Sequence, residues 1–214
     1  MAHVDLMVFD LDGTLITSGE DIAAAVNHTL GRLRLPVLSE DRIIGFIGDG
    51  VRELLIRALG EAAGEHLGPA MTIFSAYYTE HLLDTTDLYP GIRDVLERFA
   101  GKKKAIVTNK RYDFAQKIVD KLGIAGHFDA VIGAEKTPYR KPDVRIVKPL
   151  LSEYHARPGH TVVIGDGPAD IQLAKGVGAL SCAYLSGLSA RETLLALRPD
   201  FTYEDPAELK SLFY

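Results

Sequence analysis

The sequence contains one cysteine, no tryptophan and no long block of basic residues. A lone cysteine, Cys182, cannot form a disulfide within the chain, so we expect a reducing compartment, the cytoplasm. Its apolar neighbours in residues 180–185 predict a buried side chain rather than a nucleophile. There is no stretch of 18 apolar residues, so we expect no membrane span. Acidic residues from Asp5 onward argue against a signal peptide.

The charge balance excludes two classes of partner. With 24 Lys and Arg against 29 Asp and Glu, the net charge is −5, so neither nucleic acid nor an anionic membrane would be attracted. A chain of 214 residues with 47% hydrophobic residues can bury a large core and form one domain, or one domain carrying a smaller one. The sequence leaves the choice between a monomer and a homodimer open.

Short apolar runs alternate with segments of helical periodicity. The runs are rich in Val, Ile and Leu and lack strict alternation, as strands buried on both faces do. Between them, apolar residues recur at helical spacing, for example at Ile92, Val95, Leu96 and Phe99. This order predicts an α/β fold, a doubly wound parallel sheet with a Rossmann-like core. The expected strands are residues 4–9, 105–107, 130–132, 161–164 and 180–185.

One connection is too long for a single crossover helix. From Leu15 to Lys102 there are 88 residues, whereas a crossover needs roughly a dozen or more. Residues 91–100 can form the crossover helix, and the preceding part shows helical apolar stripes. We therefore expect a catalytic core of residues 1–16 and 88–214, and an inserted all-helical domain of residues 17–87.

Polar residues follow several of the expected strands, at the edge where parallel sheets bind ligands. A strand-terminal Asp alone is more often a helix cap or turn residue, and a Thr-Asn or Lys-Pro pair alone is an ordinary loop. Their shared placement at strand ends is what favours a site. The residues are Asp10 and Asp12 after the first strand, Thr108 and Asn109 after the second, Lys141 in the next loop, and Asp166 and Asp170 after the fourth.

These residue types together can transfer a phosphoryl group. The Asp10 carboxylate can act as a nucleophile and form an aspartyl phosphate, while Asp12 serves as general acid and base. Asp10 with Asp166 would hold Mg²⁺, which favours carboxylates and phosphate oxygens. Lys141 and the Thr108 hydroxyl would neutralise and position the phosphoryl oxygens.

The motifs Asp-x-Asp-Gly-Thr, Thr-Asn, Lys-Pro and Gly-Asp-x-x-x-Asp resemble those of the haloacid dehalogenase superfamily of phosphohydrolases across essentially the whole chain. The resemblance implies that Asp10 is the nucleophile and Asp12 the general acid and base. It implies Mg²⁺ bound by the Asp10 and Asp166 side chains and the Asp12 backbone carbonyl. Thr108 and Lys141 match phosphate-binding positions, and Asp170 matches the second acid near the metal. The inserted helices are similar to the family's cap, which closes over the site.

Finer similarity points to the phosphoglycolate phosphatase branch, through residues 12–15, 47–50, 89–91 and 107–110. In that branch the loop with Gly48, Asp49 and Gly50 lies near the substrate, and Asn109 is a further candidate for substrate binding. Two positions depart from the pattern: Thr17 stands where Asp is usual, and Gly167 where Ser or Thr is usual.

The leading hypothesis is a Mg²⁺-dependent phosphatase of a small phosphorylated metabolite, with 2-phosphoglycolate first. The alternatives are a phosphosugar mutase of β-phosphoglucomutase type, and a pyrophosphatase or nucleotidase of the same superfamily. A signalling receiver domain is disfavoured because its phosphorylated Asp follows a later strand than its acidic pair. We interpret Lys110 and Arg111 as a solvated helix start, and Tyr77 and Tyr78 as packing residues.

Overall fold

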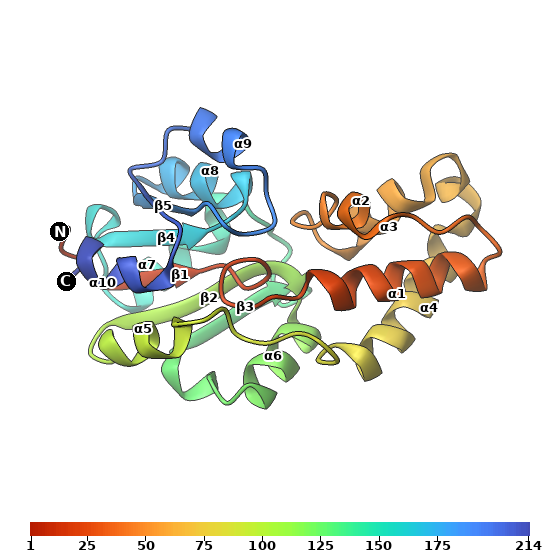
Figure 1. Cartoon of the computed structure of the whole chain (residues 1–214). Helices are drawn as coiled ribbons and strands as arrows, with labels where there is room; N and C mark the ends of the chain where they lie inside the picture. Colours follow the sequence, from red (N-terminus) through yellow and green to blue (C-terminus); the bar gives the residue numbers. More distant parts are fainter.

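Val, Ile and Leu runs form the centre of the molecule, a six-stranded parallel sheet in the order β3-β2-β1-β4-β5-β6 (Figure 1). The computed structural model describes all 214 residues. Phe9 at the end of β1 lies opposite Ile106 in β2 and Ile164 in β4, so these strands lead to one common edge. The strands are β1 (Leu6–Phe9), β2 (Lys103–Arg111), β3 (Ala130–Ala134), β4 (Thr161–Gly165), β5 (Leu180–Tyr184) and β6 (Phe201–Tyr203).

All five expected strands are confirmed, and the sixth, β6, was missed. β6 has only three residues, which is too short for a clear apolar run. β2 is longer than expected and continues to Arg111, with a shift in its pairing to β3 between Val107 and Arg111. The interpretation as a helix start is therefore wrong for Lys110, which lies within the strand, whereas Arg111 is both the last residue of β2 and the N-cap residue of α6.

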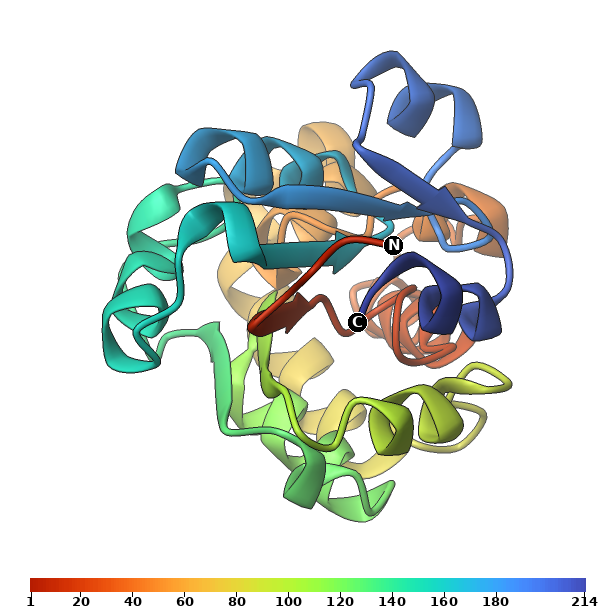
Figure 2. The ribbon, with the colours of Figure 1, turned by 90° about the vertical axis from the view of Figure 1, so that its left-hand side faces the viewer.

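Helices cover both faces of the sheet (Figure 2). Met7 and Phe9 of β1 pack in one buried cluster with helices α5 and α6, and Leu6 and Val8 pack in another with α7 and α8. This alternation within one strand explains why the strand lacks polar residues. The helices of the sheet region are α5 (Ile92–Arg98), α6 (Tyr112–Lys121), α7 (Lys148–Glu153), α8 (Pro168–Val177), α9 (Arg191–Ala196) and α10 (Leu209–Leu212).

A separate group of helices lies beside the sheet, at the right of Figure 1. Its members are α1 (Gly19–Arg32), α2 (Glu40–Ile44), α3 (Val51–Leu59) and α4 (Ala63–His81), and both α1 and α3 pack on α4. Ile22, Val26 and Leu30 form the buried stripe of α1. The expected fold, a doubly wound parallel sheet with an inserted helical cap, is confirmed. Short 3-10 helices complete the chain at Gly60–Ala62, Ala125–His127, Val144–Ile146, Pro158–His160 and Pro206–Glu208.

Two chain segments connect the cap to the sheet, and they run side by side. Ile16 and Leu88 form an antiparallel bridge, and the Thr17 N–H donates to the Asp87 carbonyl at 2.9 Å. This paired crossing lies where the cap boundaries are expected, at residues 17 and 87, and the boundaries themselves remain a prediction. Thr17, which replaces the usual Asp, also donates its hydroxyl to the Asp87 carbonyl at 3.2 Å.

Asp21, in the first turn of α1, fastens this crossing. Its carboxylate accepts hydrogen bonds from the backbone N–H and hydroxyl groups of Thr85 and Thr86, at 2.7–3.1 Å. Burial alone would raise the pKa of Asp21, but these hydrogen bonds lower it below its ordinary value. The start and the end of the cap segment are therefore joined by one buried anion.

The structure bears on two expectations that came from the composition of the chain. Cys182 is buried in β5, as predicted for a packing residue. No helix has both the length and the apolar character needed to cross a membrane.

Candidate active site

The carboxyl edge of the sheet brings the predicted motif residues together. Asp10 directly follows β1, Asp166 directly follows β4, and Thr108 lies near the end of β2. Asp170 stands in the first turn of α8, and Lys141 reaches the edge from the loop after β3. All five side chains are buried.

Three carboxylates crowd at the centre of this edge. Asp10, Asp166 and Asp170 each offer an oxygen atom, and these atoms lie within 4.8 Å of one another. Burial, with repulsion from the neighbouring carboxylates, raises the pKa of Asp10 to about 7, although Lys141 opposes the shift. Burial and Asp170 raise the pKa of Asp166 to about 6. The cluster therefore carries more negative charge than its surroundings stabilise.

Lys141 supplies one positive charge to the cluster. Its Nζ lies 2.6 Å from Oδ1 of Asp10 and 2.7 Å from Oδ1 of Asp170. Burial opposes its charge, yet these two carboxylates raise the pKa of Lys141 above its ordinary value. The contact with Asp10 is an ion pair by distance, but Oδ1 accepts no hydrogen bond of regular geometry. The Lys141 ammonium therefore joins the carboxylates of Asp10 and Asp170.

The donor set fits a divalent cation such as Mg²⁺. One lysine against three carboxylates leaves negative charge uncompensated, and hard carboxylate oxygens are the ligands that Mg²⁺ prefers. Asp166 is held in place because the Thr14 hydroxyl and the Leu188 N–H donate to its two oxygens, each at 2.8 Å. A Cβ at Gly13 would lie 2.2 Å from Oδ2 of Asp166, so this position requires glycine.

Gly167, the second departure from the family pattern, contributes a backbone contact to this site. Its backbone N–H donates to Oδ2 of Asp170 at 3.1 Å, at the start of α8. Asp170 thus pairs with Lys141 through one oxygen and caps the helix through the other, and its place in the metal shell remains a prediction.

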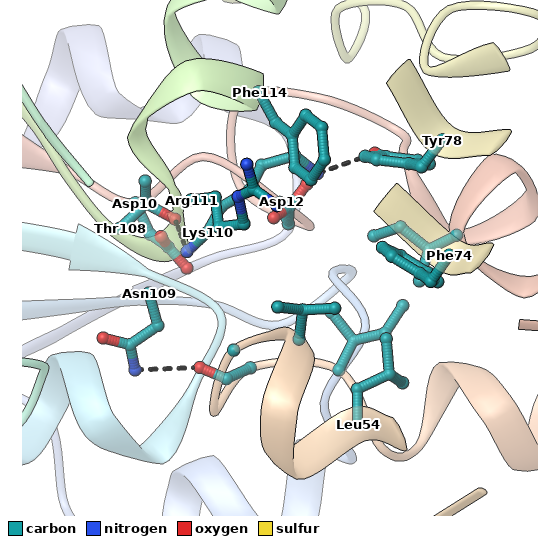
Figure 3. A pocket seen from close by; sticks show the side chains of 15 residues that line it. Asp10, Asp12, Leu54, Phe74, Tyr78, Thr108, Asn109, Lys110, Arg111 and Phe114 are labelled. Atoms are coloured by element: carbon teal, nitrogen blue, oxygen red, sulfur yellow. Dashed lines mark hydrogen bonds and ion pairs between the residues drawn. The ribbon is translucent and has the colours of Figure 1, made fainter. Parts of the chain in front are cut away.

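Asp12 is held by two donors. The Ser18 hydroxyl donates to its Oδ1 at 2.5 Å, and Lys110 Nζ donates to the same oxygen at 2.8 Å. Lys110 is buried and also contacts the Tyr78 hydroxyl of the cap, with 2.7 Å between Nζ and the oxygen (Figure 3). The expectation of a solvated Lys110 is wrong. Tyr78 does pack in the core, but its hydroxyl also reaches the site.

Asn109 connects the catalytic edge to the cap loop. Its Oδ1 accepts the Lys141 N–H at 2.9 Å, and its Nδ2 donates to the Gly48 carbonyl at 3.0 Å (Figure 3). The structure thus gives Asn109 a positioning contact, and binding of substrate by Asn109 remains a prediction. Thr108, one residue earlier, lines the pocket beside Asp10.

The cap loop closes against the core. Gly50 has φ +90°, and a Cβ there would lie 3.0 Å from the Asn109 carbonyl oxygen, so a side chain would press on β2. Gly48 lines the pocket, and the Asp49 carboxylate pairs with Arg57 on α3. The loop therefore lies beside the carboxylates, as expected, and its role in selectivity remains a prediction.

The pocket has a polar floor and an apolar wall. The floor is formed by Asp10, Asp12 and Thr108, whereas the wall combines cap and core side chains. Phe74 and Tyr78 of α4 lie toward Leu54 and Phe114 across this pocket (Figure 3). Such a pocket can bind a phosphate at its floor and a small group between the cap and the sheet.

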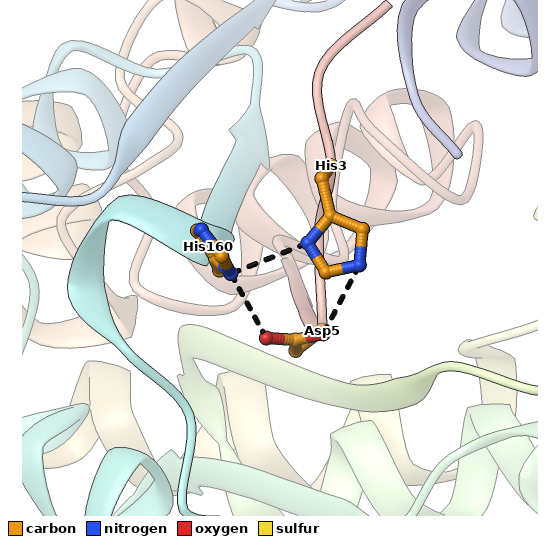
Figure 4. A group of neighbouring side chains, drawn as sticks. All are labelled: His3, Asp5 and His160. Atoms are coloured by element: carbon orange, nitrogen blue, oxygen red, sulfur yellow. Dashed lines mark hydrogen bonds and ion pairs between the residues drawn. The ribbon is translucent and has the colours of Figure 1, made fainter.

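A second polar cluster lies at the opposite edge of the sheet, where β1 and β4 begin (Figure 4). His160 Nδ1 lies 3.2 Å from His3 Nδ1 and 3.2 Å from Asp5 Oδ2. Sequence spacing could not reveal this group, because 157 residues separate the two histidines. The Arg157 guanidinium contacts the same His160 nitrogen at 2.9 Å and already brings positive charge there. We therefore assign the cluster a structural role, linking the starts of two strands.

Comparison with known families agrees with the motifs. The family model of haloacid dehalogenase-like hydrolases matches residues 7–184, which include every candidate site residue. The chain belongs to this family. Its family and its class as a hydrolase, both expected from the motifs, are confirmed.

Several relatives of this haloacid dehalogenase-like hydrolase are named phosphoglycolate phosphatase. Phosphoglycolate phosphatase of Aquifex aeolicus is 34% identical over 209 residues, covering 97% of this chain and 95% of the relative. That of Vibrio parahaemolyticus is 31% identical over 215 residues, covering 96% and 94%. The crystal structure of a predicted phosphoglycolate phosphatase from Haemophilus somnus has a TM-score of 0.93 and 28% identity, covering 99% of both chains. The resemblance to the phosphoglycolate phosphatase branch is thus confirmed.

Proposed function

We propose that the chain is a Mg²⁺-dependent phosphatase of small phosphate monoesters, with 2-phosphoglycolate as the first candidate substrate. The observation that carries the proposal is the Asp10 carboxylate, which lies buried directly after β1, 2.6 Å from the Lys141 ammonium and in one cluster with Asp166 and Asp170. A nucleophilic carboxylate needs a fixed position beside groups that neutralise the phosphoryl charge, and Lys141 is such a group. The names of the relatives support the substrate.

The residues divide the reaction into two steps. In the first, Asp10 attacks phosphorus and the bond to the leaving oxygen breaks, while Asp12 donates a proton to that oxygen. In the second, Asp12 removes a proton from water, which attacks phosphorus and releases phosphate and the Asp10 carboxylate. Lys141 and Thr108 hold the phosphoryl oxygens in both steps. Mg²⁺, held by Asp10 and Asp166 with the Asp12 carbonyl that the family implies, would neutralise charge on those oxygens.

The pocket favours a small substrate. The cap loop with Gly48, Asp49 and Gly50 and the apolar side chains Leu54 and Phe74 limit the space above the catalytic floor. Arg111 also lines the pocket and would offset a second negative charge, such as a substrate carboxylate, whereas the charge of Lys110 is paired with Asp12. We propose the cytoplasm as the compartment, because a chain with a single cysteine has no intrachain disulfide that would indicate an oxidising compartment.

Phosphate release across a substrate panel tests the proposal. With Mg²⁺, the panel holds 2-phosphoglycolate, pyrophosphate, a nucleoside monophosphate, a hexose phosphate and an aryl phosphate. We expect the highest kcat/KM with 2-phosphoglycolate and none after addition of a chelator. A higher kcat/KM with pyrophosphate or with the nucleotide would mean that this compound, and not 2-phosphoglycolate, is the substrate. Conversion of a hexose phosphate to its isomer without phosphate release would replace the phosphatase by a mutase.

A further inference from the structure

We propose that Tyr78 of the cap is a positioning residue for Asp12, acting through Lys110, so that the general acid is set only while the cap lies against the core. The inference rests on the proposed phosphatase function and deepens it. It goes beyond the motif residues, because neither Tyr78 nor Lys110 belongs to the four motifs.

Three distant segments meet in one chain of contacts. Asp12 follows β1, Lys110 lies on β2 and Tyr78 lies on α4. Lys110 Nζ is 2.8 Å from Asp12 Oδ1 and 2.7 Å from the Tyr78 hydroxyl, and both the lysine and the tyrosine are buried. A buried ammonium group requires such partners, because desolvation of an unpaired charge is costly.

The ring of Tyr78 is fixed from both sides of the pocket. It stacks on Phe74 of the cap with 5.3 Å between ring centroids, and meets the edge of Phe114 of the core at 5.1 Å. Lys110 Nζ lies 4.7 Å from the ring centroid as well. Movement of α4 away from α6 would therefore remove the hydroxyl and the ring from Lys110 together.

The contacts leave one oxygen of Asp12 for catalysis. Both Ser18 and Lys110 donate to Oδ1, so Oδ2 is the oxygen that can deliver a proton to the leaving group. Loss of the Tyr78 hydroxyl would deprive Lys110 of one partner and free its side chain to change rotamer. The direction of Asp12 would then be less well defined, although its carboxylate would remain.

The chemistry of the leaving group separates this role from a structural one. A proton donor matters for an alkyl alcohol, which is a poor leaving group, and matters little for 4-nitrophenolate, which leaves without a proton. Release of the leaving group in the first turnover isolates the step in which Asp10 is phosphorylated. For Tyr78→Phe, which keeps the ring, we expect this rate to fall about tenfold with an alkyl phosphate and less than about twofold with 4-nitrophenyl phosphate.

A neighbouring tyrosine provides the matched control. Tyr77 stacks between His28 and His81 within the cap, each with 4.1 Å between centroids, and does not contact Lys110. Tyr77→Phe should leave both rates unchanged. Lys110→Met should reproduce the selective loss seen with Tyr78→Phe, and more strongly.

The outcomes are distinguishable. A selective loss for the alkyl phosphate in Tyr78→Phe, with an unchanged melting temperature, supports the inference. An active wild-type enzyme whose Tyr78→Phe variant loses both rates equally, or neither, overturns the inference alone. A wild-type enzyme inactive on every phosphate monoester overturns the proposed function and this inference with it.

Discussion

The two sides of the pocket are built differently. On the core side, charged groups stand at the ends of adjacent strands, where Asp10, Asp166 and Lys141 lie within ion-pair or ligand distance of one another. On the cap side, Leu54, Phe74 and Tyr78 form an apolar wall, and the charged groups there pair with each other. The core side suits chemistry common to many substrates, whereas the cap side suits selection among them.

Removal of the nucleophile should abolish the activity that depends on the core side of the pocket. Asp10→Asn replaces one carboxylate oxygen by an amide of similar size and removes one of three crowded charges. We expect turnover to fall by at least about 10³-fold, with no loss of melting temperature, because the amide cannot form the aspartyl phosphate. Phosphate release and thermal unfolding measure the two effects. Asp94→Asn, at an exposed position, is the matched control. Near-normal turnover of the Asp10→Asn variant would exclude Asp10 as the nucleophile.

Loss of the core cation should cost both stability and activity. Lys141→Met leaves the buried carboxylates of Asp10 and Asp170 without their common partner. We expect the free energy of unfolding in Mg²⁺-free buffer at neutral pH to fall by about 3–5 kcal/mol, as for other broken buried pairs. Denaturant titration measures this, with Lys148→Met, exposed on α7, as control. A change below about 1 kcal/mol would show that the carboxylates do not depend on this lysine.

The core side of the pocket could be predicted from the sequence, because its residues directly follow strands that can be recognised locally. Each strand of a parallel sheet ends at the same edge, so Asp10, Thr108 and Asp166 had to meet once their strands were recognised. The apolar stripe of α1 and the length of one connection were enough to predict the inserted helices. Only the short β6 escaped, since three residues carry no periodicity.

The cap side could not be predicted in this way. Lys110 and Tyr78 are 32 residues apart and meet only because α4 packs against the end of β2. Lys110 stands before a helix in the sequence and looked solvated, yet β2 continues through it into the pocket. Asn109 likewise makes a contact that the sequence does not predict, because its amide joins Lys141 to the Gly48 carbonyl; its binding of substrate remains a prediction. Contacts between the cap and the sheet depend on tertiary packing that local sequence patterns do not encode.

The contact of Asp21 with Thr85 and Thr86, which joins the start and the end of the cap segment, should weaken at low pH. Asp21 has a lowered pKa in the folded state, so its contribution to stability is complete above the unfolded value of about 3.9 and is lost as pH falls through the lower folded value. We expect Asp21→Asn to lower the free energy of unfolding by about 1–3 kcal/mol at pH 6, and the difference from wild type to shrink below about pH 4. Denaturant titrations at several pH values measure it. A difference independent of pH would mean that the charge of Asp21 is not what the threonines stabilise.

The cap loop should show the smallest effect, and on binding rather than chemistry. The Asp49 carboxylate lines the adjoining cavity, which also contains Lys141 and Asp166, and pairs with Arg57; both side chains are substantially exposed. Because exposed pairs contribute about 0–1 kcal/mol, Asp49→Asn should change stability little. It removes a negative charge near an anionic substrate and releases Arg57, so KM should fall about two- to threefold at low salt, with kcat unchanged. The effect should disappear in about 1 M salt, where exposed charges are screened.

Glu53→Gln, in α3 after the loop, provides a charge-matched control for Asp49→Asn outside the pocket lining. A larger change in kcat than in KM would mean that Asp49 takes part in the reaction. The assignment of catalysis to the core side and of substrate selection to the cap side would then be wrong.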